Sequence, residues 1–268
     1  MAVRLITGCG SGFGEAIALA FADRNDSVVA SMRSPDRSPS SLRGRSNVDI
    51  ITLDITDAAS RRHALEQTLS RHGRLDTLVN NAGAVSRGSI EDTAEDVSRL
   101  IFETNYFGPV ELMRSVLPIM RQQGGGRIVT VTAIGAILST PLLGVYCASK
   151  QAMDSAAATV DLEGRPFGVR APCVLPGQFR TAIFNSPAEP ITEPYRDIAE
   201  TLDNVRKAHA ADVLSDLTPV VDAVLTAATD AEPKPRYLAG VGLVEEIVPA
   251  VHELERLQAF WAERCGVA

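Results

Sequence analysis

Tyr146 and Lys150 lie four positions apart in the run Tyr-Cys-Ala-Ser-Lys, which places both side chains on one face of a helix. A phenol ordinarily titrates at about pH 10, and a nearby ammonium lowers its pKa because it stabilises the phenolate. A phenol with a lowered pKa exchanges protons efficiently with a carbonyl or alcohol oxygen. The sequence therefore predicts that Tyr146 is a proton donor and acceptor whose pKa is lowered by Lys150.

A glycine-rich run, Thr7-Gly-Cys-Gly-Ser-Gly-Phe-Gly14, follows a short apolar segment and opens a helical one. Glycines in this position allow a tight turn and let the backbone approach a pyrophosphate, whose charge is favoured at a helix N-terminus. The run therefore predicts a dinucleotide site, although a glycine cluster alone is also compatible with a plain structural turn. Its candidate cofactor-binding residues are Gly8, Gly10, Ser11, Gly12, Phe13 and Gly14.

The spacing of Gly8, Gly12 and Gly14 resembles the TGxxxGxG loop of the short-chain dehydrogenase/reductase family. Further motifs extend the resemblance over residues 1–240. These motifs are Asn80-Asn81-Ala82-Gly83 (NNAG), Tyr146 to Lys150 (YxxxK), and Pro176-Gly177 with Thr181 (the PG motif). The amino-acid sequences of the glycine loop and of residues 165–170 resemble those of the steroid- and retinol-active branch of the family.

The resemblance implies a role for each matched residue. Lys150 is expected to reach the nicotinamide ribose as well as Tyr146, and Asn105 is expected to hold a water in a proton relay behind the lysine. Asp54 is expected to contact the adenine ring. The other expected cofactor contacts are Ile55, Asn81, Ala82, Gly83, Tyr146, Lys150, Pro176, Gly177, Phe179 and Thr181.

One catalytic position departs from the family pattern. The family places a serine thirteen residues before the tyrosine, where it hydrogen-bonds the substrate oxygen, and here that position is Ala133. Losing such a donor costs about 2.7–4 kcal/mol of transition-state stabilisation. Three explanations are open: an engineered Ser-to-Ala change, replacement of the hydroxyl by a neighbour, or drift towards binding or another reaction. Ser139 and Thr140 are better placed as replacements than Thr132, because adjacent strand residues point to opposite faces.

The residues after the second expected strand bear on the choice of nicotinamide nucleotide. A carboxylate there would accept bonds from a ribose diol, whereas a cation would pair with a 2′-phosphate. Met32 stands where NAD-dependent relatives usually have an acid, and Arg33 follows it. Because the guanidinium is a forked donor suited to phosphate, we expect NADP(H) to be preferred over NAD(H).

The segments expected to wall a substrate pocket are largely apolar, which favours a small hydrophobic ketone or alcohol such as a steroid, retinoid, polyketide or aromatic ketone. Phe184–Pro194 contains three prolines in a long loop of the kind that often forms a lid. The helical pattern at Ile247–Ala262 suits a substrate cover, an oligomer contact or plain packing. The candidate substrate-binding residues are Ile134, Leu142, Leu143 and Phe184.

Alternating βα units must position these residues. Short apolar runs alternate with longer amphipathic stretches, which is typical of a parallel sheet covered on both faces. Pro172 lies inside the sixth run and removes one ladder donor, which predicts a distortion there. The expected helices include Gly14–Arg24, Ala58–Arg71 and Ala94–Gln123. The expected strands are Val3–Thr7, Ser27–Met32, Val48–Leu53, Thr77–Asn80, Arg127–Thr132, Val169–Leu175 and Arg236–Ala239.

We therefore expect a single-domain α/β protein, with a Rossmann-like, doubly wound parallel sheet of about seven strands and helices on both faces. Residues 1–130 are expected mainly to bind the cofactor. Residues 131–268 are expected mainly to form the catalytic and substrate sites, with loop 178–210 as a lid. Family members usually pair through the helices that precede strands five and six, so we expect a homodimer or homotetramer.

The composition argues against several classes of protein. The chain has 268 residues and a formal net charge of −7 without a basic run, so it is a poor counterion for nucleic acid. No apolar run is long enough to span a bilayer, and the glycine loop begins too early to leave room for a signal peptide. The scattered cysteines and histidines lack the spacing of a metal site or a disulfide framework. We expect a cytoplasmic protein that binds no membrane, nucleic acid or metal.

These observations lead to one main expectation and two alternatives. The main expectation is an NADP(H)-dependent oxidoreductase that interconverts a ketone and a secondary alcohol on a small apolar substrate, with hydride transfer and Tyr146 handling the proton. The first alternative, which Ala133 raises, is a nucleotide-binding protein with weak or no redox activity. The second is a non-redox isomerase, dehydratase or cyclase that uses Tyr146 for proton transfer.

Overall fold

One parallel sheet organises the protein. The computed structural model describes residues 1–181, 183, 189–208, 210, 213–240 and 244–264. The strand order is β3-β2-β1-β4-β5-β7-β8, with β6 paired to β5, and the pairs are parallel. The strands are β1 Val3–Thr7, β2 Ser27–Met32, β3 Val48–Thr52, β4 Thr77–Asn80, β5 Gly126–Val131, β6 Val169–Arg170, β7 Cys173–Pro176 and β8 Arg236–Ala239.

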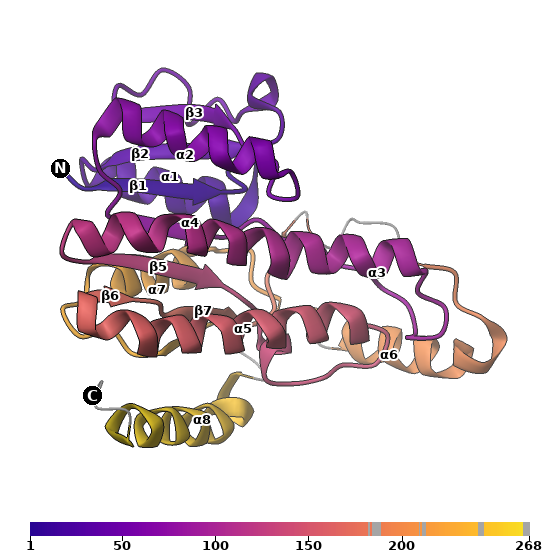
Figure 1. Ribbon diagram of the computed structural model, residues 1–268. Coiled ribbons are helices and arrows are strands. Elements are labelled where there is room, and N and C mark those ends of the chain that lie inside the picture. The colour runs from indigo at the N-terminus through magenta and orange to yellow at the C-terminus, as the bar shows by residue number, and fades with distance from the viewer. Residues whose placement is uncertain (182, 184–188, 209, 211–212, 241–243, 265–268) are drawn as a thin grey trace.

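Helices cover both faces of the sheet, as the doubly wound prediction requires. Figure 1 shows α4 and α5 running side by side across one face. Helix α6 lies beyond the start of α5, and α8 forms the last described helix. The helices are α1 Gly12–Asp23, α2 Ala58–His72, α3 Glu95–Phe102, α4 Gly108–Gln122, α5 Gly144–Gly164, α6 Arg196–Ala208, α7 Thr218–Thr229 and α8 Val244–Arg264.

Consecutive strand residues point to opposite faces, and this alternation builds two hydrophobic cores. Leu5 of β1 packs in one core with Met113 of α4 and Met153 of α5. Its neighbour Ile6 packs in the other core with Phe21 of α1 and Val224 of α7. Because both faces are covered, all five residues of β1 are buried, the polar Arg4 and Thr7 included.

The strand order reverses direction between β1 and β4, and this reversal positions the site. From β1 the chain first adds β2 and β3 on one side, and then returns to add β4 and β5 on the other. In open parallel sheets, ligands bind in the crevice outside the carboxyl ends of the strands at such a switch point. The glycine run follows β1 and the Asn81–Gly83 segment follows β4, so both lie at this crevice.

Two differences from the expected elements have local causes. The expected strand Val169–Leu175 is split into β6 and β7, which confirms the distortion predicted from Pro172. The expected helix Ala94–Gln123 contains a π-helical turn at Glu103–Phe107, between α3 and α4. Such turns insert extra residues into a helix and occur frequently at functional sites. Here the π turn carries Asn105, which is buried.

Candidate active site

The glycine run forms the turn between β1 and α1, and its backbone is closely packed. Gly8 has a φ of 76°, and a Cβ there would lie 2.9 Å from the Cα of Ala82. A Cβ on Gly14 would overlap the carbonyl oxygen of Gly8. Only glycine fits these two positions without strain. The turn leads directly into the N-terminus of α1, where free backbone N–H groups suit a pyrophosphate.

Hydrogen bonds join the glycine turn to the residues after β4. The hydroxyl oxygen of Thr7 accepts bonds from the backbone N–H groups of Asn81 and Ala82, at 3.0 Å each. The side-chain amide of Asn81 donates to the Thr7 carbonyl at 2.8 Å. On the other side of the turn, a Cβ on Gly12 would lie 3.8 Å from the Cβ of Thr181. The glycine turn, the segment after β4 and Thr181, all expected to contact the cofactor, therefore meet at one place.

The remaining expected cofactor residues lie around this turn. Ser11 caps α1 without a side-chain capping bond, and Phe13 packs edge-on against Phe179 with ring centroids 5.3 Å apart. A Cβ on Gly10 would lie 4.0 Å from the Cβ of Met32, at the end of β2. The residues from the other strand ends are Ile55, which is buried in the core beside α4, and Pro176 with Gly177, whose N–H bonds to the Ala239 carbonyl at 2.8 Å.

Arg33 is exposed immediately after the buried Met32, and its charge reaches Asp54 beyond β3. Burial alone would raise the pKa of Asp54, but hydrogen bonds from Thr56 and the positive charges of Arg33 and Arg61 hold it below its ordinary value. The Asp54 carboxylate accepts from the Thr56 backbone N–H at 2.9 Å and from its hydroxyl at 2.7 Å. This end of the crevice therefore carries an exposed guanidinium beside a fixed carboxylate.

Tyr146 and Lys150 occupy the first turns of α5 and are both buried, with 8% and 5% of their surfaces exposed. The Lys150 Nζ lies 5.9 Å from the centroid of the Tyr146 ring and donates to the Val131 carbonyl at 3.2 Å. A Cβ on Gly83 would lie 3.5 Å from Lys150 Nζ and 3.4 Å from Asn105 Oδ1. The lysine and the asparagine thus converge on the backbone of the Asn80–Gly83 motif.

Burial dominates the titration of both groups. It raises the pKa of the Tyr146 phenol above its ordinary value, and the adjacent Cys147 adds to the shift. It lowers the pKa of Lys150 to about 8. The prediction that Tyr146 has a lowered pKa is therefore wrong for the polypeptide alone, because burial removes the hydration that a phenolate needs. At neutral pH the phenol is protonated, which is the form that donates a proton to a carbonyl oxygen.

Asn105 is held rigidly by hydrogen bonds from both ends of its amide. Its Oδ1 accepts from the Ala84 N–H at 2.8 Å, and its Nδ2 donates to the Ala84 carbonyl at 2.8 Å. The same Nδ2 donates to the Ser149 hydroxyl at 3.0 Å, and that hydroxyl donates to the Tyr146 carbonyl at 2.7 Å. Sequence reasoning missed Ser149, although its spacing of three residues from Tyr146 on one helix was an available signal.

Ala133 stands where the family pattern places the serine, and it packs against the cluster that contains Tyr146. Tyr146, Cys147 and Val85 form a small buried cluster, and Ala133 packs against it. Leu143 and Ile183 pack against the same cluster. Val85 was not predicted as a site residue, because nothing in its type or spacing distinguishes it from an ordinary core valine. The phenol therefore lies among apolar side chains.

The structure does not bring the expected replacement hydroxyls to this position. The Thr132 hydroxyl is buried and donates to the Val174 carbonyl at 3.2 Å, in agreement with the expected opposite orientation. Ser139, expected to be better placed, is exposed and accepts from the Gln151 amide at 3.2 Å. Ser139 comes after the 3-10 turn Ile134–Ala136, whose Gly135 and Ala136 are buried. Thr140 makes a local turn, in which its carbonyl accepts from Leu143 N at 3.1 Å.

The expected substrate residues surround this cluster where they are described. Ile134 begins the 3-10 turn that follows Ala133, and Leu143 packs beside Tyr146. Leu142 has a φ of 60°, a left-handed conformation that costs a non-glycine residue free energy and often occurs at functional sites. Its carbonyl accepts from the Gly88 N–H at 2.9 Å. The fourth expected residue, Phe184, lies outside the described residues.

The described part of loop 178–210 is fastened to the segment after β4. The Glu189 N–H donates to the Arg87 carbonyl at 2.7 Å. The Tyr195 hydroxyl donates to the Glu91 carboxylate at 2.7 Å, and the Thr192 N–H donates to the Asp92 carboxylate at 3.2 Å. Helix α6 follows this attachment and has no buried residue. These contacts hold residues 189–195 against the segment 87–92 that follows β4.

Membrane-spanning helices and metal sites were sought among the described residues. None of the helices that the structure describes is long and apolar enough to cross a bilayer. In the same described part of the chain, no three histidine, cysteine or acidic side chains gather as a metal site would require.

Comparison with known proteins gives the family. Residues 2–191 match the short chain dehydrogenase family. A 3-ketodihydrosphingosine reductase from Bacteroides thetaiotaomicron is 35% identical over 177 residues, which are 66% of this chain and 64% of that enzyme. The chain therefore spans less than two thirds of that relative's length. The human 11-beta-hydroxysteroid dehydrogenase type 2 is 31% identical over 290 residues, covering 97% of this chain and 71% of that enzyme.

The solved structures agree with this assignment. A short-chain dehydrogenase from Streptomyces avermitilis has a TM-score of 0.82 and 30% identity, over 99% of this chain and 97% of the other. The fold, the motifs and the relatives therefore lead to one conclusion. The chain belongs to the short-chain dehydrogenase/reductase family of oxidoreductases.

Proposed function

We propose that this protein is an NADP(H)-dependent oxidoreductase that interconverts a ketone and a secondary alcohol on a small apolar substrate. One observation carries the proposal: Lys150 Nζ and Asn105 Oδ1 converge on the Gly83 backbone. Lys150 lies one turn of α5 after the buried Tyr146. Gly8 and Gly14 support a dinucleotide at the same crevice, because a Cβ on either would collide with the backbone of Ala82 or Gly8 and open the tight turn that brings the chain to the N-terminus of α1.

In this proposal the bound nicotinamide supplies or accepts a hydride, and the chain handles the proton. Tyr146 donates its phenolic proton to the carbonyl oxygen during reduction and recovers it in the reverse direction. Lys150 binds the nicotinamide ribose, and its charge compensates the phenolate that remains. Asn105 belongs to the route by which the proton is replaced. The apolar side chains around Tyr146 exclude water and favour a hydrophobic substrate.

The same proposal divides the chain by role. Residues 1–130 mainly hold the nucleotide through the ends of β1 to β4. Residues 131–268 mainly supply the reaction centre and the substrate pocket, with loop 178–210 as its cover. The described cysteines Cys9, Cys147 and Cys173 are buried free thiols, which fits the reducing environment of the cytoplasm.

The preference for NADP(H) rests on Arg33. Arg33→Ala is expected to weaken NADPH binding by about tenfold to a hundredfold, because a charge-assisted hydrogen bond to the 2′-phosphate is lost. NADH binding is expected to stay unchanged, since NADH lacks that phosphate. Fluorescence titration with both nucleotides measures the effect. The control is Arg45→Ala, because Arg45 is paired with Asp23 at 2.5 Å. Equal affinity of the unmodified protein for the two nucleotides would overturn the assignment.

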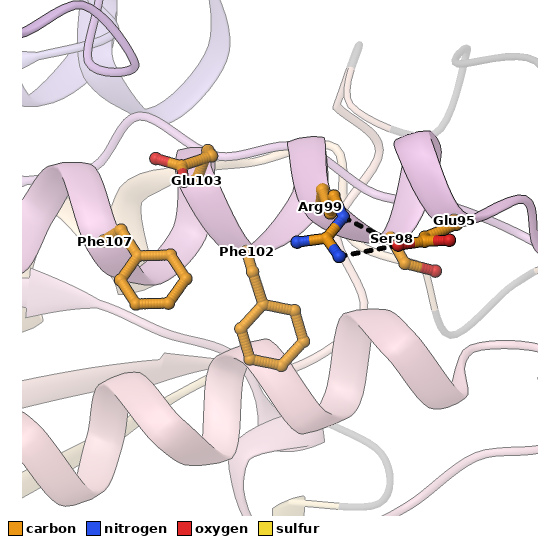
Figure 2. Close-up of a pocket in the computed structure, with 6 residues that line it drawn as sticks. All are labelled: Glu95, Ser98, Arg99, Phe102, Glu103 and Phe107. Carbon is orange, nitrogen blue, oxygen red and sulfur yellow. Dashed lines mark hydrogen bonds and ion pairs between the residues drawn. The ribbon is translucent and has the colours of Figure 1, made fainter.

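We also propose that two copies pair through the outer faces of α3, α4 and α5. Figure 2 shows Phe102 and Phe107 side by side on this surface, near the Arg99–Glu95 ion pair. The two rings help to line a hollow of about 330 Å³. An exposed Phe107 next to a half-buried Phe102, beside a hollow, is typical of an interface, because aromatic side chains are enriched there.

Phe107→Asp is expected to weaken this pairing at least about tenfold and to shift the protein to a monomer, because a carboxylate would have to be desolvated in the interface. Light scattering after gel filtration measures the mass. Phe167→Asp is the matched control, since Phe167 is 46% exposed against 49% for Phe107 and lies on the 3-10 turn after α5. An unchanged mass for Phe107→Asp, or a monomeric unmodified protein, would contradict the proposed interface.

A second candidate function is favoured by Ala133. Because Ala133 offers no hydrogen-bond donor next to Tyr146, the protein would bind the nucleotide but turn over ketones weakly, or use Tyr146 for a non-redox proton transfer. An Ala133→Ser variant separates this candidate from the first.

A further inference from the structure

Asn80 and Thr130 form a buried polar pair on neighbouring strands. They are register partners in β4 and β5, so their side chains point to the same face of the sheet. Only 3% of Asn80 and 2% of Thr130 is exposed. Both amide atoms of Asn80 and the hydroxyl of Thr130 lack a hydrogen-bond partner among the described residues. Buried polar atoms are nearly always paired, so these three need an explanation.

Lys150 lies on the same side of the sheet and has the complementary need. An ammonium carries three N–H donors and no acceptor. Within the described part of the chain, Lys150 donates to the carbonyl of Val131, the residue after Thr130, and makes no other recorded hydrogen bond. Cys173, the register partner of Thr130 on β7, is close enough to influence the charge of Lys150. Lys150 therefore has unused donors on the face of the sheet that α5 covers, and Asn80 and Thr130 have unused polar atoms on that face.

The ionisable groups around Lys150 do not offer it a free negative charge. On its own helix, burial raises the pKa of Tyr146, and Asp154 is engaged by the Arg236 guanidinium of β8 at 2.6 Å. On the sheet, burial raises the pKa of the Cys173 thiol well above its ordinary value. Asn105, on the π turn, is neutral. Uncharged hydrogen-bond acceptors must therefore stabilise the buried ammonium.

We propose that Asn80 and Thr130 hold a buried water molecule that accepts a hydrogen bond from Lys150. The water satisfies the Asn80 amide and the Thr130 hydroxyl, and it leaves one Lys150 donor for the nicotinamide ribose. Asn80 and Thr130 are positioning residues, since they act on the reaction only through Lys150. This role rests on the proposed function, in which Lys150 belongs to the reaction centre.

The test exploits the small number of lysines. Lys150, Lys207 and Lys234 are the three lysines of the chain, so lysine labelled with carbon-13 at Cε gives three resonances. A Lys150→Met variant identifies the Lys150 signal, and a pH titration of the unmodified protein is expected to give Lys150 a pKa of about 8. Thr130→Val keeps the shape of the side chain and removes its hydroxyl. It is expected to lower the Lys150 pKa by about one unit, a tenfold change in proton affinity.

Thr130→Ser is the control that keeps the hydroxyl, and it is expected to titrate like the unmodified protein. The Lys207 and Lys234 signals must not move in either variant. A Lys150 pKa that is the same in Thr130→Val and Thr130→Ser would overturn the proposal. The titration needs no substrate, so absence of turnover would count against the proposed function and not against this water site.

A high-resolution crystal structure of the unmodified protein gives a second measurement that does not depend on the variants. It is expected to show a water within hydrogen-bond distance of Lys150 Nζ, Thr130 Oγ1 and the Asn80 amide. A direct hydrogen bond between Asn80 and Thr130, with no water on Lys150, would overturn the proposal.

Discussion

Tyr146→Phe is expected to lower ketone reduction by about a hundredfold to ten-thousandfold, the usual contribution of a positioned general acid. The change removes only the phenolic oxygen and leaves the ring, which packs with Val85 and Cys147. Nucleotide binding is therefore expected to stay within a factor of about two, since the glycine turn is untouched. Steady-state rates with NADPH and an apolar ketone measure the first effect, and fluorescence titration measures the second.

The pH dependence checks that the lost group is the phenol. Burial raises the pKa of Tyr146, so the unmodified protein should reduce ketones at a constant rate from acid to neutral pH. Alcohol oxidation needs the phenolate and should accelerate as the pH rises. Cys147→Ala is the matched control, because Cys147 lies in the same buried cluster and its replacement leaves the phenol in place. Substantial reductase activity in Tyr146→Phe, or an equal loss in Cys147→Ala, would exclude Tyr146 as the proton donor.

Ala133→Ser is expected to raise the rate of ketone reduction by about a hundredfold to a thousandfold, the usual effect of one donor to a developing oxyanion. Position 133 suits a serine, because Ala133 packs against the Tyr146 cluster and its backbone is extended, with a φ of −174°, which any residue can adopt. A hydroxyl there would lie beside the oxygen that receives the tyrosine proton. The absorbance of NADPH, followed with a panel of apolar ketones, measures the gain.

The control for this gain is Ala136→Ser, which places a hydroxyl three residues further along the same 3-10 turn. It is expected to leave the rate unchanged, because Ala136 is not part of the Tyr146 cluster. A gain confined to Ala133→Ser would support a reductase that lacks one donor. Absence of turnover by both the unmodified protein and Ala133→Ser would favour the nucleotide-binding or non-redox alternatives.

The strands and the glycine turn could be predicted because their signals are local. The bounds expected for β1, β2, β4 and β8 are those of the structure, since each is a short apolar run that ends at polar or turn-forming residues. The glycine turn is equally local, because Gly8 and Gly14 occupy backbone positions that exclude a side chain. The distortion at Pro172 follows from the missing N–H of proline.

Features that depend on packing between distant segments could not be predicted. Nothing in the local sequence shows that the helix around Asn105 contains a π turn, or that Ser149 lies beneath its amide. The attachment of Tyr195 to Glu91 joins residues 104 positions apart. The pKa of Tyr146 was predicted with the wrong sign, because the spacing to Lys150 is visible in sequence whereas the burial of both groups is not.

The central claim is that Tyr146 and Lys150 face a bound nicotinamide and that a hydride passes from it to a ketone. Its most direct test is to incubate the Ala133→Ser protein with an apolar ketone and NADPH in which both hydrogens at C4 of the nicotinamide are deuterium, and to analyse the product by mass spectrometry. The account predicts an alcohol with deuterium on its carbinol carbon, and almost none when Tyr146→Phe is added. An alcohol without deuterium, or label that stays wholly in the nucleotide, would contradict it.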